Sequence, residues 1–184
     1  LHITGTITTA GIHGAGVASD ARGTSSIQNV WSDVDVTSTH SGWDECSGIV
    51  GCMKAGNLTI SDCLFSGSVT ANSSYNGGFI GYKDSGSASI VNCLSTGTFN
   101  YSSNQDFARG ASVSNSYYTQ FVGSTTGMTL TTTEQLSDGT TTTALNNGRT
   151  GDEAAWVQDP VTNLPMLKVF YQKGFIPGDA NGDG

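Results

Sequence analysis

Short runs of apolar and β-branched residues recur along the chain, and each run is bounded by Gly, Ser, Asn or Asp. Residues 77–82, 90–94 and 96–99 form one set of three runs, and residues 47–52, 60–64 and 66–69 form a matching set thirty residues earlier. The last run of each set places an apolar side chain on one face after small polar residues, which is typical of a β-strand. Self-similarity at a fixed period of about 20–50 residues predicts stacked units.

Further copies of the unit lie on both sides of these two sets. Residues 4–7 end a first copy, residues 16–36 form a degenerate copy, and residues 113–118 form a shortened one. Ile27 and Ile60 are 33 residues apart, so three extra residues lie in the loop that holds Trp43. A unit this short cannot bury its apolar face alone, so each strand must pair with the equivalent strand of the next unit. The sequence therefore predicts an all-β fold, a parallel β-helix (β-solenoid) of roughly 30-residue repeats.

One polar position recurs in four copies and predicts a corner of the coil. It is occupied by Asn29, Asp62, Asn92 and Asn115. Asn tolerates a left-handed backbone and stacked amides can bond to one another, so we expect an amide ladder that Asp62 interrupts.

The four cysteines are best explained by the repeat. Their spacings, from Cys46 to Cys52, Cys63 and Cys93, fit no zinc pattern. Cys63 and Cys93 occupy equivalent positions, so we expect them in adjacent coils with Cα atoms about 4.7–4.9 Å apart. If any pair forms a disulfide, Cys46 and Cys52 are favoured.

The repeat stops after Tyr118, and the pattern changes. Residues 131–136 and 143–148 indicate short helices, the second ended by Gly148, while residues 155–158 and 164–169 indicate a strand pair around a turn. We interpret this region as a cap over the last coil. The predicted organisation is repeats in residues 1–122 with a truncated first coil, the cap in 123–173, and a linker with the start of another module in 174–184.

Charge and composition narrow the partners. Charged residues make up 12% of the chain and the net charge is −8, which disfavours nucleic acid and anionic membranes because both select basic patches. No apolar run of 18 residues exists, so we expect no membrane insertion, and we expect a monomer. Residue 1 already lies inside a repeat, so we expect the chain to be a piece of a longer protein.

The three strands of the unit, with the patterns Gly-x-x-Gly, Ile-x-Asn-Cys and Thr-Gly-Thr-Phe, together resemble the GLUG repeats of bacterial surface proteins. The resemblance extends over about residues 1–170 and includes Asn115 to Tyr118, Trp156 and the run from Leu164 to Leu167. It implies a secreted, extracellular or cell-surface location and an adhesin-like role. Some such proteins carry a protease on another domain, but no residue of that protease motif is present here.

The segment 178–184 resembles the opening of a type I dockerin. Asp179, Asn181 and Asp183 match the first three calcium ligands of that loop, and Gly184 matches its sharp turn. The later ligands and the second loop are missing, so we expect no cofactor in this chain. Calcium and a cohesin-type partner are expected only for the intact module.

Candidate catalytic groups are sparse. No nucleophile elbow, zinc helix, phosphate loop or dinucleotide fingerprint is present. His2, His13 and His40 lie at unrelated positions of the repeat. We interpret two acidic pairs, Asp33 with Asp35 and Asp44 with Glu45, as solvated charge rather than a catalytic pair. The sequence therefore predicts that the chain is not an enzyme.

Aromatic residues precede the Gly-x-x-Gly strands. They are Trp43, Tyr75 and, in the last copy, Tyr101 with Phe107. Stacking would bring them to one edge, where aromatic rings suit sugar faces, although Tyr75 also lies near enough to Gly78 to pack into the core. We predict a non-catalytic segment, an adhesin or spacer that contacts glycans or host-surface ligands. Two alternatives remain, a polysaccharide-active enzyme and a carbohydrate-binding module.

Overall fold

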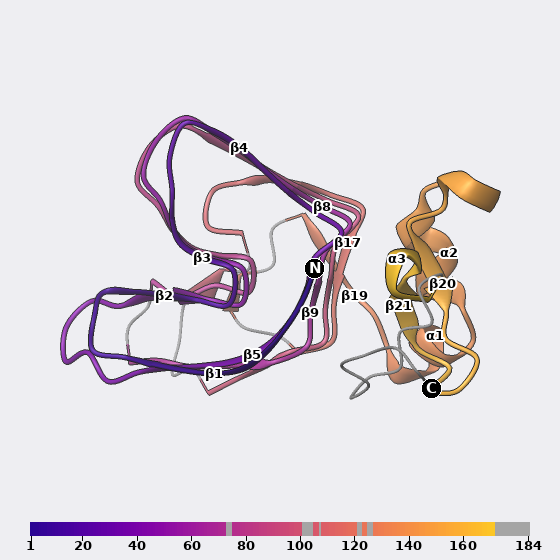
Figure 1. The fold of residues 1–184 in the computed structure, drawn as a ribbon, viewed down its shortest axis with the longest axis horizontal. Coiled ribbons are helices and arrows are strands. Elements are labelled where there is room, and N and C mark those ends of the chain that lie inside the picture. The colour runs from indigo at the N-terminus through magenta and orange to yellow at the C-terminus, as the bar shows by residue number, and fades with distance from the viewer. Residues whose placement is uncertain (73–74, 101–104, 107, 121–122, 125–126, 172–184) are drawn as a thin grey trace.

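The chain winds through stacked coils that together form a β-solenoid of about three turns (Figure 1). The computed structural model describes residues 1–72, 75–100, 105–106, 108–120, 123–124 and 127–171. Nearly every strand pairs in parallel with its equivalent in the neighbouring coil, which confirms the predicted fold class. Strands stack this way because each unit has apolar side chains for one face only.

The coil has four walls. The first contains β1 (His2–Thr9), β5 (Trp31–Ser38), β9 (Leu64–Phe65), β10 (Ser68–Thr70), β13 (Leu94–Ser95), β14 (Thr98–Phe99), β17 (Ser116–Tyr118) and β19 (Met128–Leu130). The others contain β2 (His13–Ala15) and β6 (Glu45–Ser47); β3 (Ala18–Ala21), β7 (Val50–Met53) and β11 (Ile80–Lys83); and β4 (Thr24–Gln28), β8 (Asn57–Ser61), β12 (Ser87–Val91) and β16 (Ser112–Ser114). A separate parallel pair joins β15 (Gln105–Asp106) to β18 (Gly123–Ser124).

The strand register matches the sequence alignment. Ile60 pairs with Ile90 and Leu64 with Leu94, which is the offset of thirty residues. Ile27 pairs with Ile60 across the longer loop, and Ile90 pairs with Val113 in the shortened copy. The repeat units are therefore the coils themselves.

The two glycines of the Gly-x-x-Gly run permit a sharp inward bend between the second and third walls (Figure 1). A Cβ on Gly48 would lie 2.4 Å from the ring of Phe65, and a Cβ on Gly51 would lie 2.9 Å from the carbonyl oxygen of Glu45. A side chain at Gly48 would therefore clash with Phe65 of the first wall, and one at Gly51 would push the third wall away from the second. The bend divides each coil outline into two arms.

The predicted corner is present. Asn29, Asp62, Asn92 and Asn115 all have positive φ, between 45° and 54°. Asn115 Nδ2 donates to Asn92 Oδ1 over 2.8 Å, which is one rung of the expected ladder. Asp62 departs from the amide pattern because Arg149 binds its carboxylate through both terminal nitrogens, at 2.6 and 3.1 Å.

All four cysteines are free thiols that lie buried. Cys63 and Cys93 occupy equivalent places in adjacent coils, since the strands on either side of them pair in register. The disulfide favoured between Cys46 and Cys52 is wrong. Cys46 faces the main core, whereas Cys52 faces the opposite side of its wall, near Glu45 and Lys54.

The C-terminal region contains the predicted short helices and strand pair. Its elements are α1 (Thr133–Ser137), α2 (Thr140–Asn146), a 3-10 turn η1 (Gly151–Glu153), the antiparallel strands β20 (Trp156–Gln158) and β21 (Pro165–Leu167), and α3 (Lys168–Tyr171). Thr132 and Gln135 form a capping box at the start of α1. Asn147 is the C-cap of α2, and Gly148 follows it; both are left-handed, with φ of 51° and 82°.

The position of this region differs from the expected cap over the last coil. It packs along the side of the stack, next to the first wall (Figure 1). Four outward-facing residues in successive coils form this surface, which we call the covered flank: Trp31, Leu64, Leu94 and Tyr117. Trp156, Leu145 and Leu167 pack against it because the row of apolar side chains needs burial.

Candidate functional site

Outward-facing side chains gather where the coil bends inward, on the side away from the core. Two rows run from coil to coil there, one along β2 and β6 and the other along β3, β7 and β11. His13 pairs with Glu45 in the first row, while Asp20, Cys52 and Tyr82 pair in the second. Tyr75 continues the first row, since Ser47 bridges to Gly77 two positions later. We call these six residues the outer bend.

The polar end of the outer bend is centred on His13. Its Nδ1 lies 2.7 Å from Asp20 Oδ1, and its Nε2 lies 2.9 Å from Glu45 Oε2. The side chain of His13 is about one-fifth exposed and that of Glu45 is 14% exposed. An imidazole with a carboxylate at each nitrogen is fixed in orientation, so this ring is held in place from two strands.

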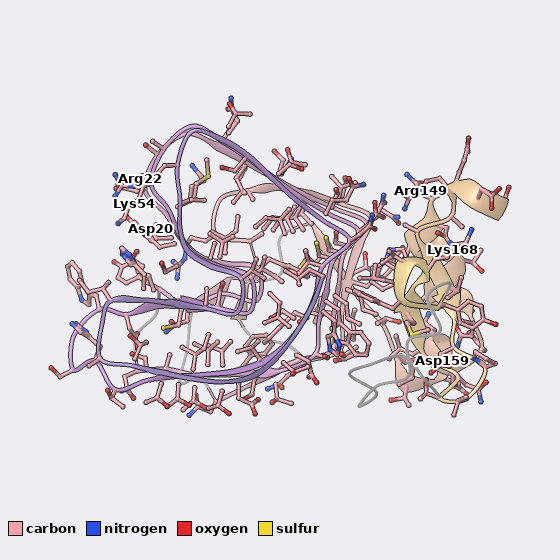
Figure 2. The ribbon with its side chains drawn as sticks, in the orientation of Figure 1. Asp20, Arg22, Lys54, Arg149, Asp159 and Lys168 are labelled. Atoms are coloured by element: carbon pink, nitrogen blue, oxygen red, sulfur yellow. The ribbon has the colours of Figure 1, made fainter. Side chains whose placement is uncertain are left out.

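Cys52 and Lys54 complete the polar end. Burial, together with a hydrogen bond to Glu45, raises the pKa of the Cys52 thiol to about 12. Lys54 Nζ lies 3.9 Å from Glu45 Oε2. Figure 2 shows Asp20, Arg22 and Lys54 together at this side of the solenoid, next to β3. A side-chain nitrogen of His13, a carboxylate oxygen of Asp20 and the Cys52 sulfur all lie within 4.8 Å of one another, which makes them possible metal ligands.

The aromatic end of the outer bend consists of Tyr75 and Tyr82, with Trp43 beside them. The ring centroids of Tyr75 and Tyr82 are 5.2 Å apart, and those of Trp43 and Tyr75 are 5.7 Å apart, both in edge-to-face arrangements. The Arg109 guanidinium lies 5.1 Å above the Tyr75 ring. Trp43 is 74% exposed. The structure thus brings together two of the three residues predicted to bind ligand.

Several predicted site residues lie outside the described part of the chain. Tyr101 and Phe107 belong to this group, as do the dockerin-like residues Asp179, Asn181 and Asp183. The predictions made for them stay predictions.

The interpretation of Asp44 and Glu45 as solvated charge is wrong. Asp44 is fully buried and accepts hydrogen bonds from the Asn72 backbone and the Asn76 amide, at 3.1 and 3.2 Å. Glu45 faces His13. Both carboxylates lie where an adjacent coil covers them, because a loop between two stacked strands is itself stacked.

Asp33 and Asp35 take part in a ladder of hydrogen bonds along the first wall. Ser66 Oγ donates to Asp33 Oδ1 over 2.9 Å, and Ser68 Oγ donates to Asp35 Oδ1 over 2.6 Å. Both bonds are exposed. Each carboxylate therefore joins two coils and lies exposed to solvent rather than enclosed in a cleft.

Two hollows lie between the solenoid and the C-terminal region. One, of about 220 Å³, is polar and contains the Asp62–Arg149 ion pair, with Lys168 at its wall (Figure 2). The other, of about 200 Å³, is lined by covered-flank residues and Met166. Both hollows lie along the interface where the C-terminal region packs against the solenoid.

The polar end of the outer bend was missed by sequence reasoning, although a signal was present. Aligning Gly16 with Gly48 gives an offset of 32 residues, and the same offset places His13 beside Glu45 and Asp20 beside Cys52. His13 matches no other histidine of the repeat, and its chemistry becomes visible only beside Glu45, its neighbour in the next coil.

Among the residues that the structure describes, no helix has the length and apolar character to cross a membrane. The resemblances to GLUG repeats and to a dockerin remain predictions from the residues alone. No protein-family model matches the sequence, and no curated protein or solved structure matches it.

Proposed function

We propose that this chain is a non-catalytic, adhesin-like β-solenoid segment of a secreted or cell-surface bacterial protein, and that it binds neutral glycans through Trp43 and Tyr75. The observation that carries the proposal is the exposure of the Trp43 side chain, 74%, beside two further aromatic rings. A large exposed aromatic surface is costly in water and marks a binding surface when other rings adjoin it.

The geometry suits a sugar chain. Trp43 and Tyr75 lie in successive coils, so their rings can contact neighbouring sugars of an extended polymer. Pyranose rings have apolar faces that stack on indole and phenol rings, while Arg109 above Tyr75 supplies hydrogen-bond donors.

Charge favours neutral over acidic glycans. The chain has a net charge of −8, which repels uronic acid polymers over the distance of a Debye length, about 8–10 Å. Asp20 and Glu45, in the adjoining part of the outer bend, add to that repulsion locally.

An extracellular location is compatible with the free thiols. All four cysteines are buried, and burial raises the pKa of Cys46 to about 11 and that of Cys52 to about 12. Thiolates are the species that oxidise, so these thiols react slowly even outside a reducing compartment.

A titration calorimetry series tests the proposal. The purified chain is titrated with neutral oligosaccharides derived from cellulose, xylan and chitin, and with an acidic pectin fragment as comparison. We expect binding to a neutral ligand that Trp43→Ala abolishes. Tyr171→Ala is the matched control, because Tyr171 is also exposed, 50%, but lies on α3 at the other side of the molecule.

Tryptophan fluorescence gives a second readout. Trp43 is far more exposed than the buried Trp156 or the partly buried Trp31, so acrylamide quenching reports mainly on Trp43. Bound glycan should protect it. Binding that is equal in Trp43→Ala and in the wild type would contradict the proposal.

The alternative of a polysaccharide-active enzyme is tested with the same ligands. Products would appear on incubation with the chain and vanish in Asp33→Asn/Asp35→Asn if that acidic pair were catalytic. We expect no products, since each of those carboxylates is exposed and bonded to a serine of the next coil.

A further inference from the structure

Four side chains with metal-binding atoms converge at the polar end of the outer bend from four different strands. They are His13 on β2, Asp20 on β3, Glu45 on β6 and Cys52 on β7. The strands belong to two adjacent coils, so backbone pairing between the coils fixes the positions of all four Cα atoms. A rigid scaffold of this kind is what a metal site requires.

The side chains point to a common centre. Ligand atoms of His13, Asp20 and Cys52 lie within 4.8 Å of one another. In tetrahedral zinc sites the bonds are about 2.0–2.3 Å long, which places neighbouring ligand atoms roughly 3.3–3.8 Å apart. Asp20 Oδ1 is now 2.7 Å from His13 Nδ1 and must withdraw by about 1 Å. Its side chain, 34% exposed, has room to do so.

Glu45 lies where it can orient the His13 imidazole without binding the ion itself. Its Oε2 lies 2.9 Å from His13 Nε2, on the opposite side of the ring from Asp20. Metal-bound histidines almost always donate the N–H of their other nitrogen to a carboxylate or carbonyl, which fixes the tautomer. Glu45 Oε2 is buried and has no hydrogen-bond partner in the described structure, so a small rotation of the ring would let Nε2–H donate to it and would leave Nδ1, 2.7 Å from Asp20 Oδ1, to bind the ion.

The position of Cys52 suits a metal ligand better than a residue of the apolar core. It is fully buried, yet it lies on the opposite side of its wall from the apolar cluster that contains Val50 and Met53. Its equivalent in the next coil is Tyr82 and in the previous coil Asp20, so the repeat pattern does not require cysteine here.

We propose that His13, Asp20 and Cys52 bind a zinc ion, with Glu45 orienting the imidazole. Imidazole nitrogen, thiolate sulfur and carboxylate oxygen form a typical zinc set, whereas calcium and magnesium require oxygen ligands. Three protein ligands leave the fourth tetrahedral position to water. Lys54, whose side chain is 23% exposed, moves outward as the ion binds.

Calorimetric titration of the full chain with zinc chloride tests the proposal. We expect one equivalent bound with a Kd of about 1 µM or tighter. His13→Gln and Cys52→Ser should each abolish this binding, and Glu45→Gln should weaken it by about 10–100-fold. His40→Gln is the matched control and should leave it unchanged, since His40 lies in the loop before Trp43.

Cobalt provides a readout that needs no variant. Cobalt(II) bound at this site should give the visible bands of a tetrahedral ion and a thiolate charge-transfer band in the near ultraviolet, and Cys52→Ser should lose the latter. Failure of the wild-type chain to bind either ion would overturn the proposal. So would zinc binding that persists in Cys52→Ser or disappears in His40→Gln. Neither experiment involves a glycan, so the result is independent of the proposed function.

Discussion

The covered flank and the outer bend are two outward surfaces of the same coils, but only the covered flank packs against the C-terminal region. On the covered flank the repeated position holds Trp31, Leu64, Leu94 and Tyr117, all apolar or aromatic, and the C-terminal region packs against them. On the outer bend the repeated positions change from polar to aromatic along the stack, and Trp43 beside them is exposed. A surface row that stays apolar from coil to coil indicates packing within the chain, whereas a row that changes character indicates a surface available for binding.

The largest expected effect tests the covered flank. Trp156→Ala removes a side chain that is 1% exposed and whose indole nitrogen donates to the Asn92 carbonyl oxygen over 3.2 Å. We expect the free energy of unfolding to fall by about 3–5 kcal/mol, as for other buried Trp truncations. Urea unfolding followed by circular dichroism measures it. A loss below about 1 kcal/mol would mean that the flank needs no cover.

The second test concerns the ion pair that joins the C-terminal region to the corner, between Arg149 and Asp62. Arg149→Met leaves the Asp62 carboxylate, 3% exposed, without its partner. We expect a loss of about 1–3 kcal/mol, reduced from the value for fully buried pairs because Arg149 is 28% exposed.

The double variant Arg149→Met/Asp62→Asn sharpens this result. It places Asn where the corner of three other coils already has Asn, so most of the lost stability should return. A double variant as unstable as the single one would show that the uncompensated carboxylate is not the cause.

The sequence predicted the walls and the corner but not these two surfaces. The walls follow from a register that repeated Ile, Asn and Cys positions specify at every coil, as the pairing of Ile60 with Ile90 confirms. The side position of the C-terminal region was missed because the outward-facing row that contains Leu64 and Leu94 was not identified. Alternation along Cys63, Leu64 and Phe65 already directs Leu64 outward.

The outer bend was harder to predict for a physical reason. Its first two coils are offset by 32 residues rather than thirty, and its side chains differ from coil to coil, so self-similarity does not reveal them. The interactions of Asp44 with Asn76 and of Glu45 with His13 depend on loops that become neighbours only after the coils stack.

The third test asks whether the interior behind the bend is as dry as the rest of the core. Burial, and then the nearby Asp44 carboxylate, raises the pKa of Cys46 from its ordinary value of 9.0 to about 11. Between these values the folded chain keeps a proton that the unfolded chain has lost, so stability falls as pH rises.

Raising the pH from 8 to 10 should therefore lower the free energy of unfolding by about 1.4 kcal/mol through this thiol. The measurement is the difference in pH dependence of unfolding free energy between wild type and Cys46→Ala. Identical slopes would show that water reaches the thiol.

The smallest expected effect tests the exposed side of the comparison. Trp43→Ala should change the free energy of unfolding by less than about 0.5 kcal/mol, because the indole is 74% exposed. Thermal and urea unfolding of this variant also serve as the folding control for the glycan titrations. A loss of several kcal/mol would place Trp43 among the structural residues.

The C-terminal region is tied to every coil that it passes, and this governs how the molecule comes apart. Phe170 packs on His2 and Trp31, Arg149 binds Asp62, Trp156 reaches Asn92, and Asn115 donates to the Ala144 carbonyl oxygen. A stack of repeats held only by contacts between neighbours can fray from either end. Here one segment, synthesised after all the coils, packs against each of them. All coils should therefore lose their protection against amide hydrogen exchange together.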